Sequence, residues 1–446
     1  MEHIKVFKIA LIQARIRCSR FDRHTSQGNF FVLEDELERQ GGLASYLRKA
    51  EKAEISIEPL IIRANAGDDV EIHLTNLSGT GNFKSLTERF HVEEGQRAIF
   101  LHTYLFARHD RETNDTLGAL LVEEAGATFH DVHTGSELSF GAKAVIRRRN
   151  GTSFREFALF IQNSCINYRM EPMWERQENQ RDPAYLFSSH VHGDPGTPVF
   201  ETYPGEELRF QLLYDNCRKP IHIIGMPGQT DPPAAAPPCT PRRDADRNPV
   251  LTVRVTKPYA PGDYLYYFGE TDSLWLGLWG ILRAYSRPCK LLKPLADKNG
   301  NTPSALPSPN KGDIIRTYEA AAVQLKHNPG KPLFVPLPPG GRRRHSIHKA
   351  RPLVLHANAG DWIELTLHNQ METSPLRVSL SPESMSFDPV YHSGINVGCN
   401  QWEQTVRPGT RKKYLWHADQ DCELCPIQSF CDIRGQAPGQ IVISKL

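Results

Sequence analysis

Three stretches of the chain share one pattern of hydrophobic and polar positions. Residues 58–77, 197–216 and 351–370 each contain a short apolar run, a glycine followed by an acidic residue, and a segment in which apolar and polar side chains alternate. Alternation with a period of two predicts a β-strand with one buried face. The first and third stretches are identical at ten of twenty positions, so we expect the chain to repeat one β-rich unit.

A second shared feature closes each unit. An apolar strand is predicted to begin at Gly118, at Gly280 and at Gly439. Together the two features divide the chain into three homologous domains, each of the size of a β-sandwich. The domains are predicted at residues 1–150, 151–290 and 313–446.

The segments outside the repeats have a different composition. Residues 33–54 give the best helix candidate, and the Pro- and Ser-rich residues 287–312 are typical of a linker. Residues 225–249 and 327–351 predict long loops, because they are rich in proline, glycine and charged residues and show no apolar periodicity.

Composition excludes several function classes. The 446 residues include 53 Lys and Arg against 51 Asp and Glu, a formal net charge of +2, so neither nucleic acid nor a membrane is expected as a partner. No apolar run is long enough to span a bilayer. Lys8 and Arg15 interrupt the first apolar segment, which therefore lacks the uninterrupted apolar region of a signal peptide. A cytoplasmic location is expected. Nine cysteines, an odd number, favour mostly free thiols.

Histidines in two places are candidate metal ligands. In the first domain a glycine-led alternating segment ends in His102-Thr103-Tyr104, and the equivalent segment of the third domain ends in His417-Ala418-Asp419. His190-Val191-His192 is an intact His-x-His tripeptide. On a strand its two imidazoles would lie on one face and bind a metal together with Asp194. The alternative is a set of ordinary strand or turn histidines bonded to their neighbours.

The last candidate site is rich in cysteine. Cys422, Cys425 and Cys431 have the spacing C-x2-C followed by C-x5-C, and with His417 they supply four donors within fifteen residues. C-x2-C is typical of a zinc knuckle or a redox pair. The alternative is free or disulfide-linked cysteines in a loop.

The turn, the alternating strands and the tripeptides together resemble the cupredoxin domains of multicopper oxidases, most closely the large bacterial copper oxidases related to manganese oxidase. The resemblance covers nearly the whole chain and implies an all-β fold of three cupredoxin-like Greek-key β-sandwich domains. The runs that carry it include PLIIRANAGDDVEIHLTN (59–76), INYRMEP (166–172), FSSHVHGDPGTPVF (187–200), LWLGLWGILRAY (274–285), INVGCNQWEQTVRPG (395–409) and FCDIRG (430–435).

The same resemblance implies a type 1 copper and a trinuclear copper cluster, held by histidines and a cysteine. This chain departs from that ligand pattern in every domain. Tyr104 replaces a histidine in the first, Tyr267 and Gly269 do so in the second, and Ser381 does so in the third. Each lost imidazole removes a metal bond. We therefore expect no complete trinuclear cluster and, as cofactor, either none or a single metal ion, copper or zinc.

Three functions are open at this point. The first is a copper-oxidase-like protein that has lost its cluster and acts as a diverged oxidoreductase or small-molecule-binding protein, with at most one metal ion. The second is a copper-dependent oxidoreductase whose smaller site is rebuilt from His102, Tyr104, His417 and Cys431, which requires the outer domains to face each other. In either case His102 and Tyr104 are the candidate catalytic residues. The third is a non-catalytic subunit of a larger copper oxidase; a homo-oligomer is the other assembly considered.

Overall fold

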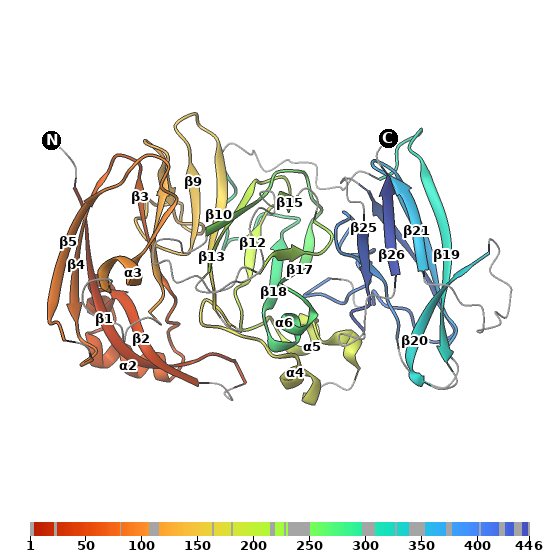
Figure 1. Cartoon of the computed structure of the whole chain (residues 1–446), viewed down its shortest axis with the longest axis horizontal. Helices are drawn as coiled ribbons and strands as arrows, with labels where there is room; N and C mark the ends of the chain where they lie inside the picture. Colours follow the sequence, from red (N-terminus) through yellow and green to blue (C-terminus); the bar gives the residue numbers. More distant parts are fainter. Residues whose placement is uncertain are drawn as a thin grey trace.

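The computed structural model consists of three β-sandwiches. Figure 1 shows them side by side along the long axis of the molecule in chain order, with the N-terminus at the first and the C-terminus at the third. The predicted fold class, all-β with three β-sandwich domains, is confirmed by the sheets described below. The structure describes residues 4–21, 25–80, 82–106, 116–162, 165–179, 182–214, 219–226, 229–230, 250–296, 308–325, 328–338, 353–371, 377–400, 403–418, 424–431 and 439–444.

The first sandwich packs a four-stranded sheet against a three-stranded sheet. Their orders are β2 (Thr25–Leu33), β1 (Ile4–Arg17), β4 (Asp69–Asn76), β5 (Ser85–His91), and β3 (Leu60–Asn65), β7 (Gly118–Glu123), β6 (Ala98–Phe100). The helix predicted over 33–54 forms two helices, α1 (Glu34–Arg39) and α2 (Leu43–Glu51). Gly41 and Gly42 separate them, because both have a φ of +88°, outside the right-handed helical region.

The middle sandwich has a seven-stranded and a four-stranded sheet. The first has the order β15 (Gln229–Thr230), β16 (Val250–Val255), β13 (Leu208–Tyr214), β10 (Ser153–Gln162), β9 (Lys143–Arg147), β8 (Thr128–His130), with β11 (Cys165–Ile166) also paired to β10. The second has the order β12 (Phe200–Thr202), β18 (Trp279–Ala284), β17 (Gly262–Phe268), β14 (Ile221–Ile223). Strands β8 and β9 fall within the first predicted domain, yet they pair within this sheet.

Short helices fill the connections of the middle sandwich. They are α4 (Met173–Asn179), a 3-10 turn (Pro183–Tyr185), α5 (Ser189–His192) and α6 (Thr271–Leu276). The longest helix that the structure describes is α2, with nine residues, and none of the described helices could cross a membrane.

The third sandwich consists of two four-stranded sheets. Their orders are β20 (Asn328–Leu337), β19 (Ile315–Leu325), β22 (Trp362–Asn369), β24 (Arg411–His417), and β21 (Leu353–Asn358), β26 (Gly439–Ser444), β25 (Leu424–Gln428), β23 (Ser381–Pro382). The prediction of a loop from residue 327 is wrong for 328–337. The prolines of β20 are tolerated because it is the outermost strand of its sheet and pairs on one side only.

The repeat seen in the sequence is a repeat of strand pairing. The strand before each glycine-acidic turn pairs in parallel with the closing strand: β3 with β7, β12 with β18, and β21 with β26. The strand after the turn pairs in parallel with the opening strand: β4 with β1, β13 with β10, and β22 with β19. Gly67, Gly205 and Gly360 have φ values of +87°, +82° and +89°, which residues with a Cβ rarely adopt.

The acidic residue of each turn has a structural role. Its carboxylate accepts a hydrogen bond from the backbone amide three residues before it, at 2.7 to 3.0 Å. A basic residue of the opening strand supplies the opposite charge. The three pairs are Asp68 with Lys5, Glu206 with Arg155, and Asp361 with Arg316. The repeated glycine-acidic turn is therefore explained by its role in the fold.

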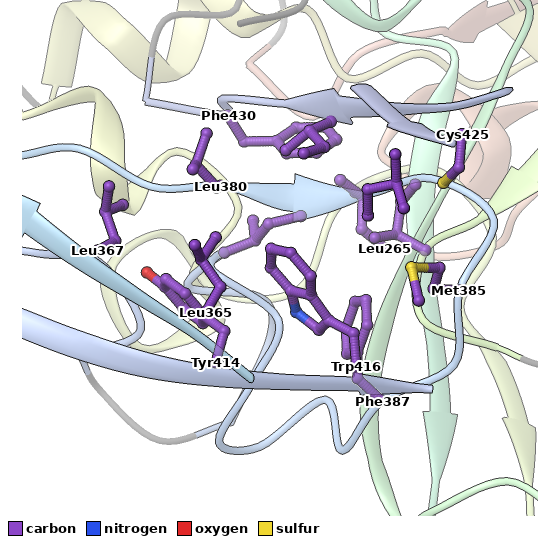
Figure 2. Close-up of a cluster of buried hydrophobic side chains, with 14 of the residues drawn as sticks. Leu265, Leu365, Leu367, Leu380, Met385, Phe387, Tyr414, Trp416, Cys425 and Phe430 are labelled. Atoms are coloured by element: carbon purple, nitrogen blue, oxygen red, sulfur yellow. The ribbon is translucent and has the colours of Figure 1, made fainter. Parts of the chain in front are cut away.

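The largest buried apolar cluster joins the middle and third sandwiches. It includes Leu265 and Trp279 of the middle sandwich and Trp416 and Phe430 of the third. Figure 2 shows the Trp416 ring in the centre of this cluster, with Leu265 reaching it from the middle sandwich. Because apolar contacts run across the boundary without interruption, the two sandwiches share one core.

Candidate functional site

His102, the first predicted catalytic residue, lies in a short helix. The alternating pattern predicts a strand through residue 104, but β6 ends at Phe100 and α3 (Leu101–Phe106) follows. The prediction is wrong here because Leu101 and Leu105 are both buried, and a spacing of four residues suits a helix. The His102 side chain is 8% exposed, and its ring stands perpendicular to that of Phe100. The side chain of Tyr104 lies outside the described residues.

The structure does not bring His102 and His417 together. Figure 1 shows α3 in the first sandwich and the sheet of β19 and β20, which includes β24 and His417, at the opposite end of the molecule. A site shared by the outer domains, as the rebuilt copper site requires, is therefore not formed by these two residues.

His190 and His192 also lie in a helix, α5, rather than on one face of a strand. Asp194, their predicted partner, is engaged elsewhere. Its carboxylate accepts hydrogen bonds from the Arg283 guanidinium at 2.8 and 2.9 Å and from the Ser189 hydroxyl at 2.7 Å. Gly193, with a φ of +72°, ends the helix before Asp194.

The electrostatics around His192 are unfavourable for a cation. Burial, and next the guanidinium groups of Arg176 and Arg20, lower the pKa of His192 to about 4. Because the same positive charges repel a metal ion as well as a proton, these residues do not fit a metal site.

The predicted cluster of His417 with three cysteines is not assembled. Tyr414 and Trp416 of β24 face the core, so the neighbouring His417 faces the other way, since successive strand side chains alternate. Its ring is 4.7 Å from that of Trp362. Cys425 lies in the opposite sheet on the core side, as Figure 2 shows. Cys422 lies outside the described residues.

The two described cysteines of this cluster are packed as thiols. The Cys425 sulfur accepts a hydrogen bond from the Ser384 amide, and the Cys431 thiol donates one to the Ser379 hydroxyl, both at 3.4 Å. Burial raises the pKa of Cys431 to about 12, whereas a metal ligand must be a thiolate. In the part of the chain that the structure describes, no three His, Cys, Asp or Glu side chains are grouped as a metal site.

Two of the side chains at the positions where the resemblance places copper ligands, Tyr267 and Ser381, are buried in the protein's own packing. Tyr267 is buried, and its hydroxyl donates a hydrogen bond to Glu383 at 3.0 Å. Ser381 is fully buried in β23. Tyr267 belongs to the apolar cluster that joins the middle and third sandwiches. A serine hydroxyl is a poorer copper ligand than an imidazole.

A buried ion network joins the first and middle sandwiches. The Glu156 carboxylate is fully buried and accepts hydrogen bonds from Arg63 Nη1 at 2.5 Å, Arg209 Nε at 2.6 Å and Gln211 Nε2 at 3.1 Å. Arg209 also pairs with Glu123. We call these five residues the Glu156 network.

No local motif predicts the Glu156 network, because its members come from four strands. Arg63 and Glu123 lie in β3 and β7, Glu156 in β10, and Arg209 and Gln211 in β13. One signal is nevertheless present in the sequence. The segment SFREFALFIQ (153–162) places charges inside an apolar strand. A buried charge requires a partner, so such a strand predicts an opposite charge on a neighbouring strand.

A cavity of about 570 Å³ opens over the Glu156 network. We call it the network cavity. Gln211 is fixed in its wall, because its Oε1 accepts a hydrogen bond from the Thr252 hydroxyl at 2.7 Å while its Nε2 donates to Glu156. The residues that line the cavity are Ala66, Gly95, Gln96, Arg97, Val122, Glu123, Glu124, Arg209, Gln211, Thr252 and Arg254.

Positive charge is in excess around the network cavity. Burial, and next the guanidinium groups of Arg254, Arg63 and Arg97, lower the pKa of Arg209 to about 9, which still leaves it charged at neutral pH. Among the described residues, Arg97 and Arg254 have no carboxylate within ion-pair distance. An anion would relieve the repulsion among these groups, so the cavity favours a negatively charged ligand.

No family model and no curated protein matches the chain. Among solved structures, it is similar to a multi-copper oxidase from Pseudomonas thermotolerans, at 11% identity and a TM-score of 0.30, with complete coverage of both chains. It is similar to the copper-containing nitrite reductase (NirK) from Thermus scotoductus SA-01, at 12% identity and a TM-score of 0.36, again with complete coverage of both chains. The laccase from Botrytis aclada has 12% identity and a TM-score of 0.35, over 98% of this chain and 87% of the laccase.

The chain is thus similar to copper proteins over its whole length. At this identity and these TM-scores, the similarity carries no conclusion about activity. The function has to be argued from the residues of this chain.

Proposed function

We propose that this chain is a copper-oxidase-like protein without a trinuclear copper cluster, and that it binds a small organic anion in the network cavity. The observation that carries the proposal is the gathering of three guanidinium groups, those of Arg97, Arg209 and Arg254, against two carboxylates in the wall of a cavity between two sandwiches. The tyrosine and serine side chains at the expected copper positions support the first half of it.

The cavity lining suits a carboxylate or phosphate that also carries hydroxyl groups. Arg97 and Arg254 are exposed and present planar sets of N–H donors, which match two oxygens of such an anion. Glu124, also exposed in the lining, offers acceptors for a hydroxyl group. We therefore expect a small hydroxylated anion, such as a hydroxycarboxylate or a sugar phosphate.

The Glu156 network would position the ligand. Glu123 and Glu156 hold the Arg209 guanidinium from two sides, so little side-chain entropy is lost when it meets an anion. His102 is not among the residues that line the cavity. Its catalytic role remains a prediction that the binding proposal does not need.

Isothermal titration calorimetry with citrate, tartrate, glucose 6-phosphate and inorganic phosphate at fixed ionic strength tests binding. At least one of the hydroxylated anions should bind with one site per chain and more tightly than inorganic phosphate. Arg97→Ala should weaken that binding about tenfold or more, because a charge-assisted hydrogen bond contributes about 1.5–3 kcal/mol. Arg254→Ala should do the same.

The matched control is Arg89→Ala. Arg89 is exposed in β5, on the outer sheet of the first sandwich, and does not line the cavity. Its loss should leave the dissociation constant unchanged. Equal affinity in the wild type, Arg97→Ala and Arg254→Ala would contradict the proposed site. Mass-spectrometric metal analysis tests the other half, and a trinuclear complement of copper in the purified protein would contradict it.

A further inference from the structure

Cys18 and Cys165 meet at another contact between the first and middle sandwiches. Cys18 directly follows β1, and Cys165 begins β11. Both are free cysteines, and the interaction between their side chains is the largest influence on the pKa of each. Neither residue belongs to the Glu156 network or lines the network cavity.

A tight hairpin presents Cys165. β11 leads into the two-residue loop Asn167-Tyr168, which the bridge between Ile166 and Arg169 closes. Both loop residues have positive φ, 50° and 65°, as a type I′ turn requires. Asparagine adopts this conformation readily, whereas tyrosine does so at a cost.

Contacts with the first sandwich hold Tyr168 in that conformation. Its ring is 5.0 Å from the Phe30 ring, and its hydroxyl accepts a hydrogen bond from the Leu117 amide at 3.0 Å. The hairpin is therefore fixed against the sandwich that carries Cys18.

Backbone hydrogen bonds set the position of Cys18. The Met170 amide donates to the Cys18 carbonyl at 2.9 Å. The Arg169 guanidinium donates to the carbonyl of Arg17, which also places its positive charge beside the two thiols. The bridge between Ile166 and Arg169 sets Cys165 beside Met170, and the Met170 amide is bonded to the Cys18 carbonyl, so held backbone segments bring the two cysteines into one neighbourhood.

We propose that Cys18 and Cys165 are an oxidisable thiol pair, which a hydroperoxide converts into a disulfide that cross-links the first sandwich to the middle one. This inference does not rest on the proposed function. The roles of the two thiols follow from their surroundings. The interaction with Cys165, opposed by burial and helped by Arg169, lowers the pKa of Cys18 to about 7. The interaction with Cys18, together with burial, raises the pKa of Cys165.

The reaction balances with hydrogen peroxide as oxidant. The Cys18 thiolate attacks one peroxide oxygen, the O–O bond breaks, and the leaving hydroxide takes up a proton to become water. Cys18 is then a sulfenic acid. The sulfur of Cys165 attacks the Cys18 sulfur and displaces hydroxide, which takes the Cys165 proton and leaves as a second water. Two thiols and one peroxide give one disulfide and two waters.

Access favours a small oxidant. The Cys18 side chain is 8% exposed, and Cys165 is half-buried. Cys399 is the more exposed thiol, but burial and next Asp263 raise its pKa. Cys399 is therefore a control for reactivity that follows exposure alone.

The test is a hydrogen peroxide titration of the full chain, followed by proteolysis without reductant and mass spectrometry. At peroxide levels that leave Cys399 reduced, we expect a peptide in which Cys18 is cross-linked to Cys165, and dithiothreitol should remove it. Cys399→Ser should still form it. Cys165→Ser should lack it and should accumulate a dimedone-reactive sulfenic acid at Cys18.

Two results would overturn the proposal: oxidation of Cys399 before the pair, or oxidation of Cys18 in the wild type without the cross-linked peptide. Because Cys165→Ser changes a half-buried position, its circular dichroism is compared with that of the wild type, and Cys165→Ala serves as the second variant. The cross-linked wild type should also unfold at a higher urea concentration than the reduced protein.

Discussion

Glu156→Gln removes the central charge of the Glu156 network without changing the size of the side chain. In the wild type the buried carboxylate accepts hydrogen bonds from three side chains. In the variant Arg209 keeps its pair with Glu123. The hydrogen bonds that Arg63 keeps are those from Nη2 and Nε to the carbonyl oxygen of Gly141, at 2.9 and 3.1 Å. One buried guanidinium therefore loses its counter-charge.

Breaking a buried ion pair costs about 3–5 kcal/mol. We expect the loss for Glu156→Gln to be near the lower end, about 3 kcal/mol, because Gly141 and the Phe129 ring, 5.8 Å away, still stabilise Arg63. Glu124→Gln, at an exposed carboxylate in the same cavity wall, should cost under about 0.5 kcal/mol. Urea unfolding by circular dichroism measures both, and hydrogen exchange of β3 and β10 peptides shows whether the loss is local.

The double variant Arg63→Met with Glu156→Gln separates this explanation from a loss of packing. If the unpaired guanidinium causes the cost, removing it should restore about 1.5 kcal/mol or more relative to Glu156→Gln alone. Additive losses in the double variant, or a loss below about 1 kcal/mol in Glu156→Gln, would refute the reasoning.

Three further predictions concern other sites. Trp416→Ala should cost about 3–5 kcal/mol in urea unfolding because the side chain is fully buried, whereas Tyr391→Ala, at a side chain 53% exposed, should cost under about 0.5 kcal/mol. The folded chain binds fewer protons at His192 than the unfolded chain between pH 6.5 and about 4, so the free energy of unfolding should fall as the pH is lowered through that window. In thermal unfolding, His192→Gln should lose less stability over this window than the wild type. Identical pH profiles of the two proteins would contradict this. Gly277→Ala should lower the unfolding midpoint, because φ is +108° and the added Cβ would lie 2.6 Å from the Glu171 amide nitrogen; an unchanged midpoint would show that the loop moves freely.

The sequence predicts what is local in this molecule. The turn glycines and the alternating strands are visible in the chain because their signals span a few residues, and their threefold repetition strengthens them. The short helices at His102 and His190 escape prediction, because a few residues of mixed pattern fit a strand as well as a single helical turn. The distance between His102 and His417 depends on how whole sandwiches are arranged, which no tripeptide encodes.

The candidate site is less accessible to sequence reasoning than the fold. The Glu156 network joins strands that are far apart in the chain, and each member by itself is an unremarkable arginine, glutamate or glutamine. Only the charges inside the apolar strand at 153–162 hint at it. The thiol pair likewise depends on a hairpin of one sandwich docking onto the end of a strand in another.

The pairing of β9 with β10 decides where the chain can be cut. It runs from Ser153 with Arg147 to Phe157 with Lys143. A fragment that starts at residue 151 would leave this side of β10 uncovered, as a row of free amide and carbonyl groups on a strand whose side chains are almost all buried. Bare sheet edges of this kind act as templates for other chains, so such a fragment should aggregate. A fragment that begins before Thr128 keeps its own protective strands.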